Sequence, residues 1–200
     1  MDHLEIEVKF RITDIEDMRH RLISMGANRK KERVFETNYR YDTESHDLLE
    51  KKSILRLRKD REAVLTFKSQ PDSPNEEFKI HKEIEVRVDD FDKTAMIVEA
   101  MGFKKQQVYE KWRETFEKDK TEIVIDSLPY GHFIEIEGQP ENIRDIASRL
   151  GLDWDRRILV SYLELFARIK AIYGLPFSDI TFDHFTGIRI DIARVLKNAK

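Results

Sequence analysis

The sequence contains no cysteine and little glycine or proline. Without cysteine, it can form no disulfide bond, no cysteine zinc site and no thiol nucleophile. Its 7 glycines and 5 prolines leave no low-complexity stretch, and the segment 69–75, with Pro71 and Pro74, is the clearest break. A length of 200 residues suits one domain, or one domain with a small appendage.

Long apolar runs and an excess of one charge are also missing. No apolar run approaches the ~20 residues of a membrane-spanning helix, and the first residues carry neither the basic nor the apolar region of a signal peptide. The 36 Lys and Arg residues nearly balance 39 Asp and Glu residues, whereas a dedicated nucleic-acid binder normally has a basic excess. A P-loop is absent too. We therefore expect a cytoplasmic protein that binds neither membranes nor nucleic acid.

What the sequence has in abundance is charge, at 38% of residues against roughly 25% in typical globular proteins. Much of it alternates with apolar residues, which predicts strands at 4–11, 34–42, 53–59, 63–68, 78–88, 108–118, 122–127 and 132–138. Helices are predicted at about 14–25, 90–101, 140–150 and 158–173. The charge run 29–33 is predicted to be a solvated turn.

The charged positions of these strands share faces. Successive strand side chains point to opposite sides, so Glu5, Glu7 and Lys9 lie together, opposite Ile6 and Val8. A single strand of this kind is typical of any sheet with one face in water. Here, however, the polar faces are almost purely charged. The basic set is Lys9, Arg56, Arg58, Lys68, Lys111 and Arg113, and the acidic set is Glu5, Glu7, Asp126, Glu135 and Glu137.

If about eight such strands close into a barrel, the charged faces point inward and the apolar faces hold helices outside. Buried charges need partners. A polyanion suits the basic set, and divalent cations suit the carboxylates, because Mg²⁺ prefers carboxylate oxygens, waters and substrate phosphates. The alternative is a structural β-protein whose salt-bridged faces lie in water.

Several segments, in order, resemble the motifs of the CYTH superfamily, the triphosphate tunnel metalloenzymes. The resemblance begins with the Glu-x-Glu-x-Lys pattern of Glu5, Glu7 and Lys9 and covers roughly residues 4–165. The other matching segments are 39–43 (Tyr-Arg-Tyr-Asp-Thr), 55–58 (Leu-Arg-Leu-Arg), 65–68 (Leu-Thr-Phe-Lys), 83–86 (Glu-Ile-Glu-Val), 111–113 (Lys-Trp-Arg), Asp126 with 131–138, and 161–165 (Ser-Tyr-Leu-Glu-Leu). The pattern is most similar to prokaryotic class IV adenylyl cyclases and thiamine triphosphatase-like proteins.

The resemblance implies an α+β fold, an eight-stranded antiparallel closed β-barrel with helices packed outside, over residues 1–170. Residues 171–200 would form a C-terminal extension with a short helix packed on the barrel. This extension either covers an end of the barrel or mediates formation of a homodimer, and the sequence leaves both open.

The resemblance also implies roles for the charged residues. Lys9, Arg56, Arg58, Lys68, Lys111 and Arg113 would bind a triphosphate, and Glu5, Glu7, Asp126, Glu135 and Glu137 would hold Mg²⁺ or Mn²⁺. The catalytic residues would be Glu5, Glu7, Lys9 and Glu137. Glu83, Glu85 and Arg87 would either face the tunnel or pair with one another.

The function implied first is that of a class IV adenylyl cyclase, which converts ATP to cyclic AMP and pyrophosphate. Hydrolysis of thiamine triphosphate or of inorganic tripolyphosphate is the alternative reaction. A non-catalytic module that binds triphosphates or polyphosphate is a third reading, although binding alone would not need so many metal ligands.

Overall fold

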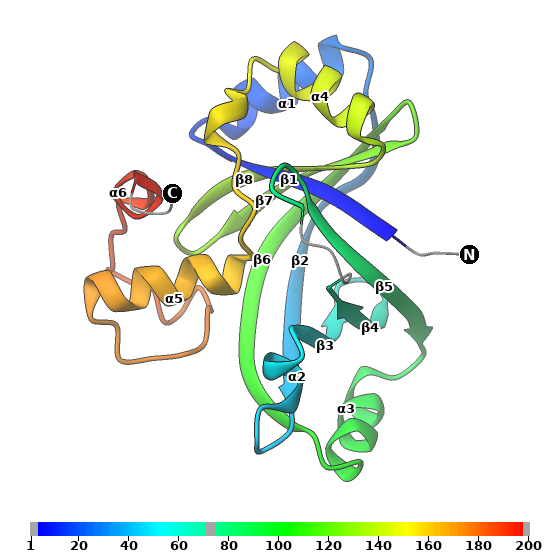
Figure 1. Cartoon of the computed structure of the whole chain (residues 1–200), viewed down its shortest axis with the longest axis vertical. Helices are drawn as coiled ribbons and strands as arrows, with labels where there is room; N and C mark the ends of the chain where they lie inside the picture. Colours follow the sequence, from blue (N-terminus) through cyan, green and yellow to red (C-terminus); the bar gives the residue numbers. More distant parts are fainter. Residues whose placement is uncertain (1–3, 71–74, 198–200) are drawn as a thin grey trace.

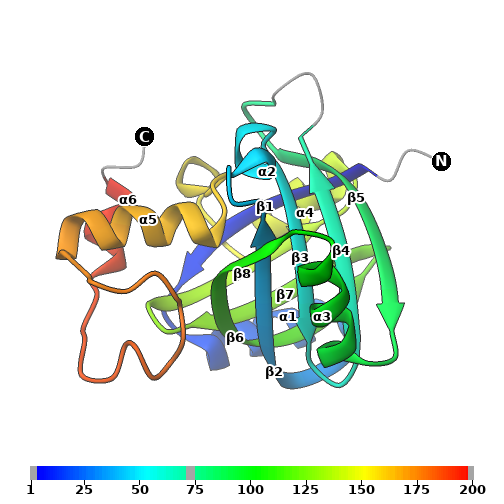
Figure 2. The same cartoon turned by 90° about the horizontal axis from the view of Figure 1, so that it is seen from below.

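A computed structural model describes residues 4–70 and 75–197 of the chain, so the break predicted at Pro71 and Pro74 lies outside the described residues. Eight antiparallel strands close into a barrel in the order β1-β5-β4-β3-β2-β6-β7-β8 (Figures 1 and 2). They are β1 (Leu4–Ile12), β2 (Asn28–Asp42), β3 (Ser53–Lys59), β4 (Ala63–Ser69), β5 (Lys79–Val88), β6 (Lys104–Lys118), β7 (Thr121–Leu128) and β8 (Gly131–Glu137). The predicted barrel is confirmed.

Strand β2 begins earlier than predicted. Residues 29–33 were expected to form a solvated turn, but they lie in β2 and pair with the end of β6, with register shifts next to Arg29, Lys31 and Val34. Both strands have 15 residues. The prediction was wrong because a long partner strand supplies backbone hydrogen bonds, whatever the polarity of the exposed side chains.

Two helices cover the barrel on the side of β1, β7 and β8. They are α1 (Ile15–Ser24) and α4 (Pro140–Arg149), which lie side by side in Figure 1. Asp14 caps α1 by accepting a hydrogen bond from the backbone N–H of Asp17. Leu22 and Ile143 join the apolar outer face of the barrel in one buried core that includes Ile134. This side of the barrel therefore follows the predicted arrangement, with charge inside and apolar residues outside.

A third helix, α3 (Phe91–Ala100), packs on the outer face of β2 and β3 through Phe91 and Val98, which contact Tyr41 and Leu57. The short helix α2 (Asp47–Glu50), which the sequence did not predict, lies between β2 and β3. The cover is incomplete, because Ile84 on the outer face of β5 is 66% exposed.

The helix α5 (Tyr162–Tyr173) begins four residues later than predicted. Ser161 and Glu164 form a capping box at its start, and the preceding Ile158 instead forms a β-bridge with Lys9. A one-turn 3₁₀ helix, η1 (Trp154–Arg156), connects α4 to this segment.

The C-terminal segment packs beside α5. It ends in α6 (Ile192–Lys197), which shares a buried core with α5 and with the β7–β8 turn. Ile180 pairs with β6 at Tyr109, in the part of β6 that extends past its pairing with β7. No helix in the described ranges is both long and apolar enough to cross a membrane.

Candidate active site

A cavity of about 650 Å³ lies inside the barrel. Because side chains alternate along a strand, every second residue of a strand can reach it. All eight strands contribute to its wall, and the start of α5 adds Ser161, Tyr162 and Leu163. The charged side chains on the wall are Glu5, Glu7, Lys9, Lys31, Glu36, Arg40, Arg56, Arg58, Asp60, Lys68, Lys79, Glu83, Glu85, Lys111, Arg113, Glu122, Glu135 and Glu137.

The six basic residues predicted to bind a triphosphate all reach this cavity: Lys9, Arg56, Arg58, Lys68, Lys111 and Arg113. They come from four strands, β1, β3, β4 and β6. Lys9 is 1% exposed and Lys111 is 2% exposed. An ammonium group this deeply buried requires compensating charge, which Glu135 supplies to Lys9 at 2.6 Å and Asp126 supplies to Lys111 at 3.0 Å.

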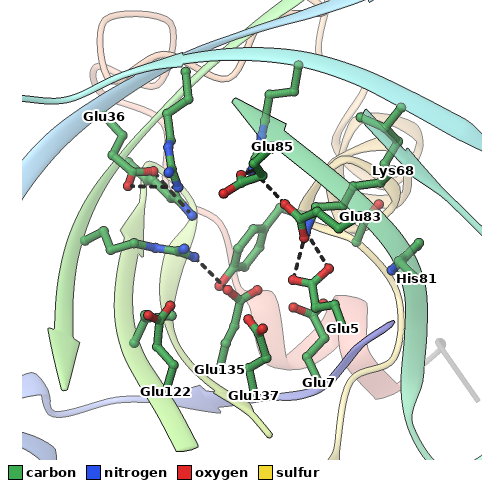
Figure 3. Close-up of a pocket in the computed structure, with 18 of the residues that line it drawn as sticks. Glu5, Glu7, Glu36, Lys68, His81, Glu83, Glu85, Glu122, Glu135 and Glu137 are labelled. Atoms are coloured by element: carbon green, nitrogen blue, oxygen red, sulfur yellow. Dashed lines mark hydrogen bonds and ion pairs between the residues drawn. The ribbon is translucent and has the colours of Figure 1, made fainter. Parts of the chain in front are cut away.

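The four glutamates predicted on β1 and β8 also reach the cavity. Glu137 lies directly opposite Glu7 in the β1–β8 ladder and directly opposite Glu122 in the β7–β8 ladder. Directly opposed strand residues have Cβ atoms about 4.5–5.5 Å apart. Figure 3 shows Glu5, Glu7, Glu135 and Glu137 directed toward one common space, with Glu36 on the opposite wall.

Ion pairs connect the two sets of charges. The amine-to-carboxylate distance is 2.6 Å in each of the pairs Lys9–Glu135, Lys68–Glu5 and Lys79–Glu7. Burial alone would raise the pKa of Glu7, but the nearby amines, Lys79 first, lower it to about 2. Burial would likewise raise the pKa of Glu135, but the positive charges of Lys9 and Arg113 hold it well below its ordinary range.

Two carboxylates behave in the opposite way. Burial and the neighbouring carboxylates of Glu5, Glu122 and Glu7 raise the pKa of Glu137 to about 8. Burial, together with a hydrogen bond and charge repulsion from Glu5, raises the pKa of Glu83 to about 8. Both groups lie where negative charge is crowded, so a cation in this part of the cavity would favour their ionised forms.

This donor set fits a hard divalent cation. Glu5, Glu7, Glu135 and Glu137 offer only carboxylate oxygens, which are the protein ligands that Mg²⁺ and Mn²⁺ accept. No three of the described Asp, Glu and His side chains already lie close enough together to hold a metal ion. The ion pairs with Lys9, Lys68 and Lys79 hold the carboxylates apart, and a metal would have to displace part of this pairing.

Asp126 occupies a different place from the one expected of a metal ligand. None of its surface is exposed, and the residues on the cavity wall do not include it. Its carboxylate accepts hydrogen bonds from Lys111, from Arg113 and from the hydroxyl of Tyr162. The structure therefore places Asp126 behind the basic residues, as their counter-ion.

The three residues named on β5 separate into two groups. Glu83 and Glu85 lie on the cavity wall, where Glu83 pairs with Lys68 at 2.7 Å. Arg87 does not reach the cavity, because its side chain is 77% exposed and pairs with Glu62. It follows the same alternation, but it lies one residue from the end of β5, beyond the enclosed part of the barrel.

Sequence reasoning gave no site role to Tyr162 or to six charged residues on the cavity wall: Lys31, Glu36, Arg40, Asp60, Lys79 and Glu122. Lys79 shares a face of β5 with Glu83 and Glu85, so extending that alternation would have found it. Glu36 lies on β2, where no site residue had been proposed. Tyr162 is the first residue of α5. Tyr162 is buried in the core around α5, and no strand pattern shows that a helix also enters the cavity.

The closed barrel and its two charged walls define a β-barrel protein with a polar internal site. The CYTH domain model matches residues 3–165, and the chain belongs to the CYTH domain family. A relative in Methanocaldococcus jannaschii, provisionally named an adenylate cyclase, is 29% identical over 174 residues, which are 81% of this chain and 98% of that protein.

Solved structures share the fold. A Vibrio parahaemolyticus protein, provisionally described as an adenylate cyclase, has a TM-score of 0.75 at 20% identity, and the match covers 84% of this chain and 99% of that one. A Hippeastrum protein, provisionally described as an adenylyl cyclase with a dominant triphosphatase activity, has a TM-score of 0.58 at 17% identity, covering 82% and 95%. At these identities the likeness concerns the fold.

Proposed function

We propose that this protein is a metal-dependent enzyme that acts on a triphosphate inside the barrel, and that it converts ATP to cyclic AMP and pyrophosphate. The observation that carries the proposal is the meeting of a basic and an acidic set of side chains in one cavity. Arg56 and Arg58 of β3 and Lys111 and Arg113 of β6 line the cavity together with the carboxylates of β1 and β8, and Arg113 pairs with Glu135 of β8 at 2.7 Å.

The basic wall suits the phosphate chain. An arginine guanidinium can donate two parallel hydrogen bonds to phosphate oxygens, whereas a lysine amine acts as a point charge. Arg56 and Arg58 alternate along β3 and so share the inner face. Lys111 and Arg113 do the same on β6, which β2 separates from β3 in the barrel. These four cations can together contact more phosphate oxygens than a single phosphate offers.

The acidic wall suits the cation. We propose Glu5, Glu7, Glu135 and Glu137 as the residues that would hold Mg²⁺ or Mn²⁺. When bound there, the ion would supply positive charge to phosphate oxygens and to the transferring phosphorus. The chain itself supplies the site and, through side chains held on the inner face of a closed barrel, the orientation of the phosphates.

Two reactions fit such a site. In cyclisation, the ribose 3′-oxygen forms a bond to the α-phosphorus, its proton leaves, and pyrophosphate departs. In hydrolysis, a water oxygen forms the bond to the terminal phosphorus, the bond from that phosphorus to the bridging oxygen breaks, the diphosphate departs, and orthophosphate and a proton are released. The name of the Methanocaldococcus relative favours cyclisation. The charged lining favours hydrolysis equally well. An enzyme specific for ATP needs surface against which the adenine base can stack, but Tyr109 and Tyr162, the tyrosines on the wall, are both at least 92% buried and offer little of it.

Product analysis decides between them. The protein is incubated with ATP and Mg²⁺ or Mn²⁺, and the products are separated by chromatography. Cyclic AMP with equimolar pyrophosphate supports the cyclase. If the products are ADP and phosphate, and phosphate is released faster from tripolyphosphate or thiamine triphosphate, the protein is a triphosphatase and the cyclase proposal is wrong. If ATP binds tightly but is unchanged after prolonged incubation, the protein is a non-catalytic module that binds triphosphates.

A further inference from the structure

Tyr162 on the cavity wall and Asp126 behind that wall form a buried pair that contacts Lys111 and Arg113. The Tyr162 hydroxyl donates a hydrogen bond to Oδ2 of Asp126 over 3.0 Å. Asp126 is fully buried and Tyr162 is 8% exposed. We propose that Asp126 and Tyr162 are positioning residues, which fix Lys111 and Arg113 for the triphosphate and do not bind the metal. This inference rests on the proposed function.

Asp126 is already engaged by two cations at its observed position. Its Oδ1 accepts Nε of Arg113 at 2.7 Å. Its Oδ2 accepts Nη2 of Arg113 at 2.5 Å, Nζ of Lys111 at 3.0 Å and the Tyr162 hydroxyl. A carboxylate offers about four lone-pair sites, two on each oxygen, so Oδ2 has no site left and Oδ1 has one, on a side chain with no exposed surface. A metal ion at Asp126 would lie against the positive charges of Lys111 and Arg113 or would have to displace them.

Tyr162 also contacts the basic residues through its ring. The ring centroid lies 4.3 Å from the amine of Lys9 and 5.6 Å from that of Lys111. Burial and the charge of Asp126 raise the pKa of the Tyr162 phenol well above its ordinary value, so the hydroxyl keeps its proton and acts as a donor. One side chain thus orients two amines and their counter-ion.

The position of Tyr162 is fixed from outside the barrel. The hydroxyl of Tyr130 donates to the backbone oxygen of Tyr162 over 2.9 Å, and the ring of Phe133 packs against the ring of Tyr162 at 5.2 Å. The capping box at Ser161 sets where α5 begins. The first turn of α5, a helix that follows the barrel in the chain, therefore becomes part of the cavity wall.

The hydroxyl matters because it competes for Asp126. If the phenol oxygen is removed, Lys111 and Arg113 remain as the donors to Oδ2 of Asp126. Lys111 and Arg113 then bind Asp126 more closely, and they bind a phosphate in the cavity less well. We expect Tyr162→Phe to weaken the binding of tripolyphosphate, measured by titration calorimetry in the presence of a chelator, about threefold to tenfold, a fraction of what a direct hydrogen bond to a charged group contributes.

Tyr173→Phe is the matched control. It removes a hydroxyl from the last residue of α5, where it accepts a hydrogen bond from the backbone N–H of Asp191. A purely structural role of the tyrosines on α5 predicts the same effect in both variants. Unchanged tripolyphosphate affinity in Tyr173→Phe, with weaker affinity in Tyr162→Phe, supports the positioning role. Equal affinities in the two variants overturn it.

The metal is tested separately, with Mn²⁺ alone and free Mn²⁺ measured by electron paramagnetic resonance. Asp126→Asn should leave Mn²⁺ binding within about twofold, and Glu137→Gln should weaken it at least about tenfold, because the loss of even an outer-shell partner of a metal ligand usually costs about tenfold to a hundredfold. Equal weakening in both variants overturns the assignment of Asp126. If Asp126→Asn does not fold, the comparison of the two tyrosine variants still tests the positioning role. Wild-type protein that binds no tripolyphosphate would instead overturn the proposed function itself.

Discussion

Glu7 and Glu137 lie directly opposite each other on β1 and β8, yet their pKa values are shifted in opposite directions. Burial would raise both. Glu7 pairs with Lys79 at 2.6 Å and its pKa falls to about 2. Glu137 lies between Glu7 and Glu122, has no ion pair among the described residues, and its pKa rises to about 8. Equivalent residues on two strands therefore affect folding in opposite ways.

The first prediction concerns the pH dependence of stability. The folded protein keeps a proton on Glu137 up to about pH 8, whereas an unfolded glutamate releases it near 4.5. Between these values the folded state binds more protons, so the free energy of unfolding falls as pH rises. Glu137→Gln should remove this part of the decline. We expect the variant to be more stable than wild type by about 1–2 kcal/mol at pH 8.5, a value reduced for solvent screening, in urea denaturation without metal.

Glu7→Gln is the control for that prediction. Its folded pKa is lowered, so the stability it contributes is present above pH 4.5 and is lost only as pH falls toward 2. The substitution leaves Lys79 without its ion-pair partner. Glu7→Gln should therefore be less stable than wild type at pH 6, and by a smaller amount at pH 8.5, because losing the Glu7 charge also relieves part of the repulsion that raises the pKa of Glu137. A loss of stability in both variants at pH 8.5 would contradict the repulsion assigned to Glu137.

The second prediction concerns metal addition. A cation that binds only the folded state stabilises it by about 2.7 kcal/mol at 100 times its Kd. At pH 8, Mg²⁺ should raise the urea midpoint of wild type and have much less effect on Glu137→Gln. Glu117→Gln serves as the comparison, because Glu117 is half exposed and pairs with Lys30. Equal stabilisation of all three proteins by Mg²⁺ would place the metal elsewhere.

The sequence predicted the strands well because the period of two is a strict geometric consequence of strand structure. The same period determined which residues face inward, and it identified Arg56 and Arg58 as neighbours on one face. It also placed Arg87 on the inward face of β5, but at Arg87 the alternation continues past the enclosed part of the barrel and the side chain is exposed. Face assignment follows from the strand itself, but enclosure depends on how long the neighbouring strands are.

Partner choice could not be predicted, because it depends on the register between strands. Glu7 and Glu137 have the same residue type and the same pattern, and only the pairing of β1 with β5 brings Lys79 to Glu7. Asp126 followed the acidic pattern, yet the two basic residues on adjacent β6 enclose it. The contribution of Tyr162 depends on the packing of α5, which no local pattern in the strands encodes.

The third prediction concerns the basic wall. Arg58→Ala should weaken tripolyphosphate binding roughly tenfold to a hundredfold, the range for hydrogen bonds to charged groups. Arg87→Ala is the matched control, since this arginine lies on a strand of the same barrel but is exposed and paired with Glu62. Titration calorimetry of both variants checks the prediction. A similar loss in the two would indicate only a general electrostatic attraction to the protein surface.

The last prediction concerns Glu36, an acidic residue on the basic side of the cavity. It is 1% exposed, and its carboxylate lies 3.6 Å from the amine of Lys111 and 4.0 Å from Arg58. Burial opposes its ionisation, but Lys111, Arg113 and Arg58 lower its pKa to about 2. It is therefore ionised at neutral pH and competes with phosphate for the same cations.

Glu36→Gln should bind metal-free tripolyphosphate more tightly, by about tenfold for a gain of 1.4 kcal/mol. It should also be less stable without ligand, because neighbouring cations lose a buried counter-ion. The two effects are measured by calorimetry and by urea denaturation on the same preparation. Glu122→Gln, which changes a cavity carboxylate on the acidic side, should not increase affinity. If Glu36→Gln binds tripolyphosphate more weakly, Glu36 orients the cations and does not compete with the ligand.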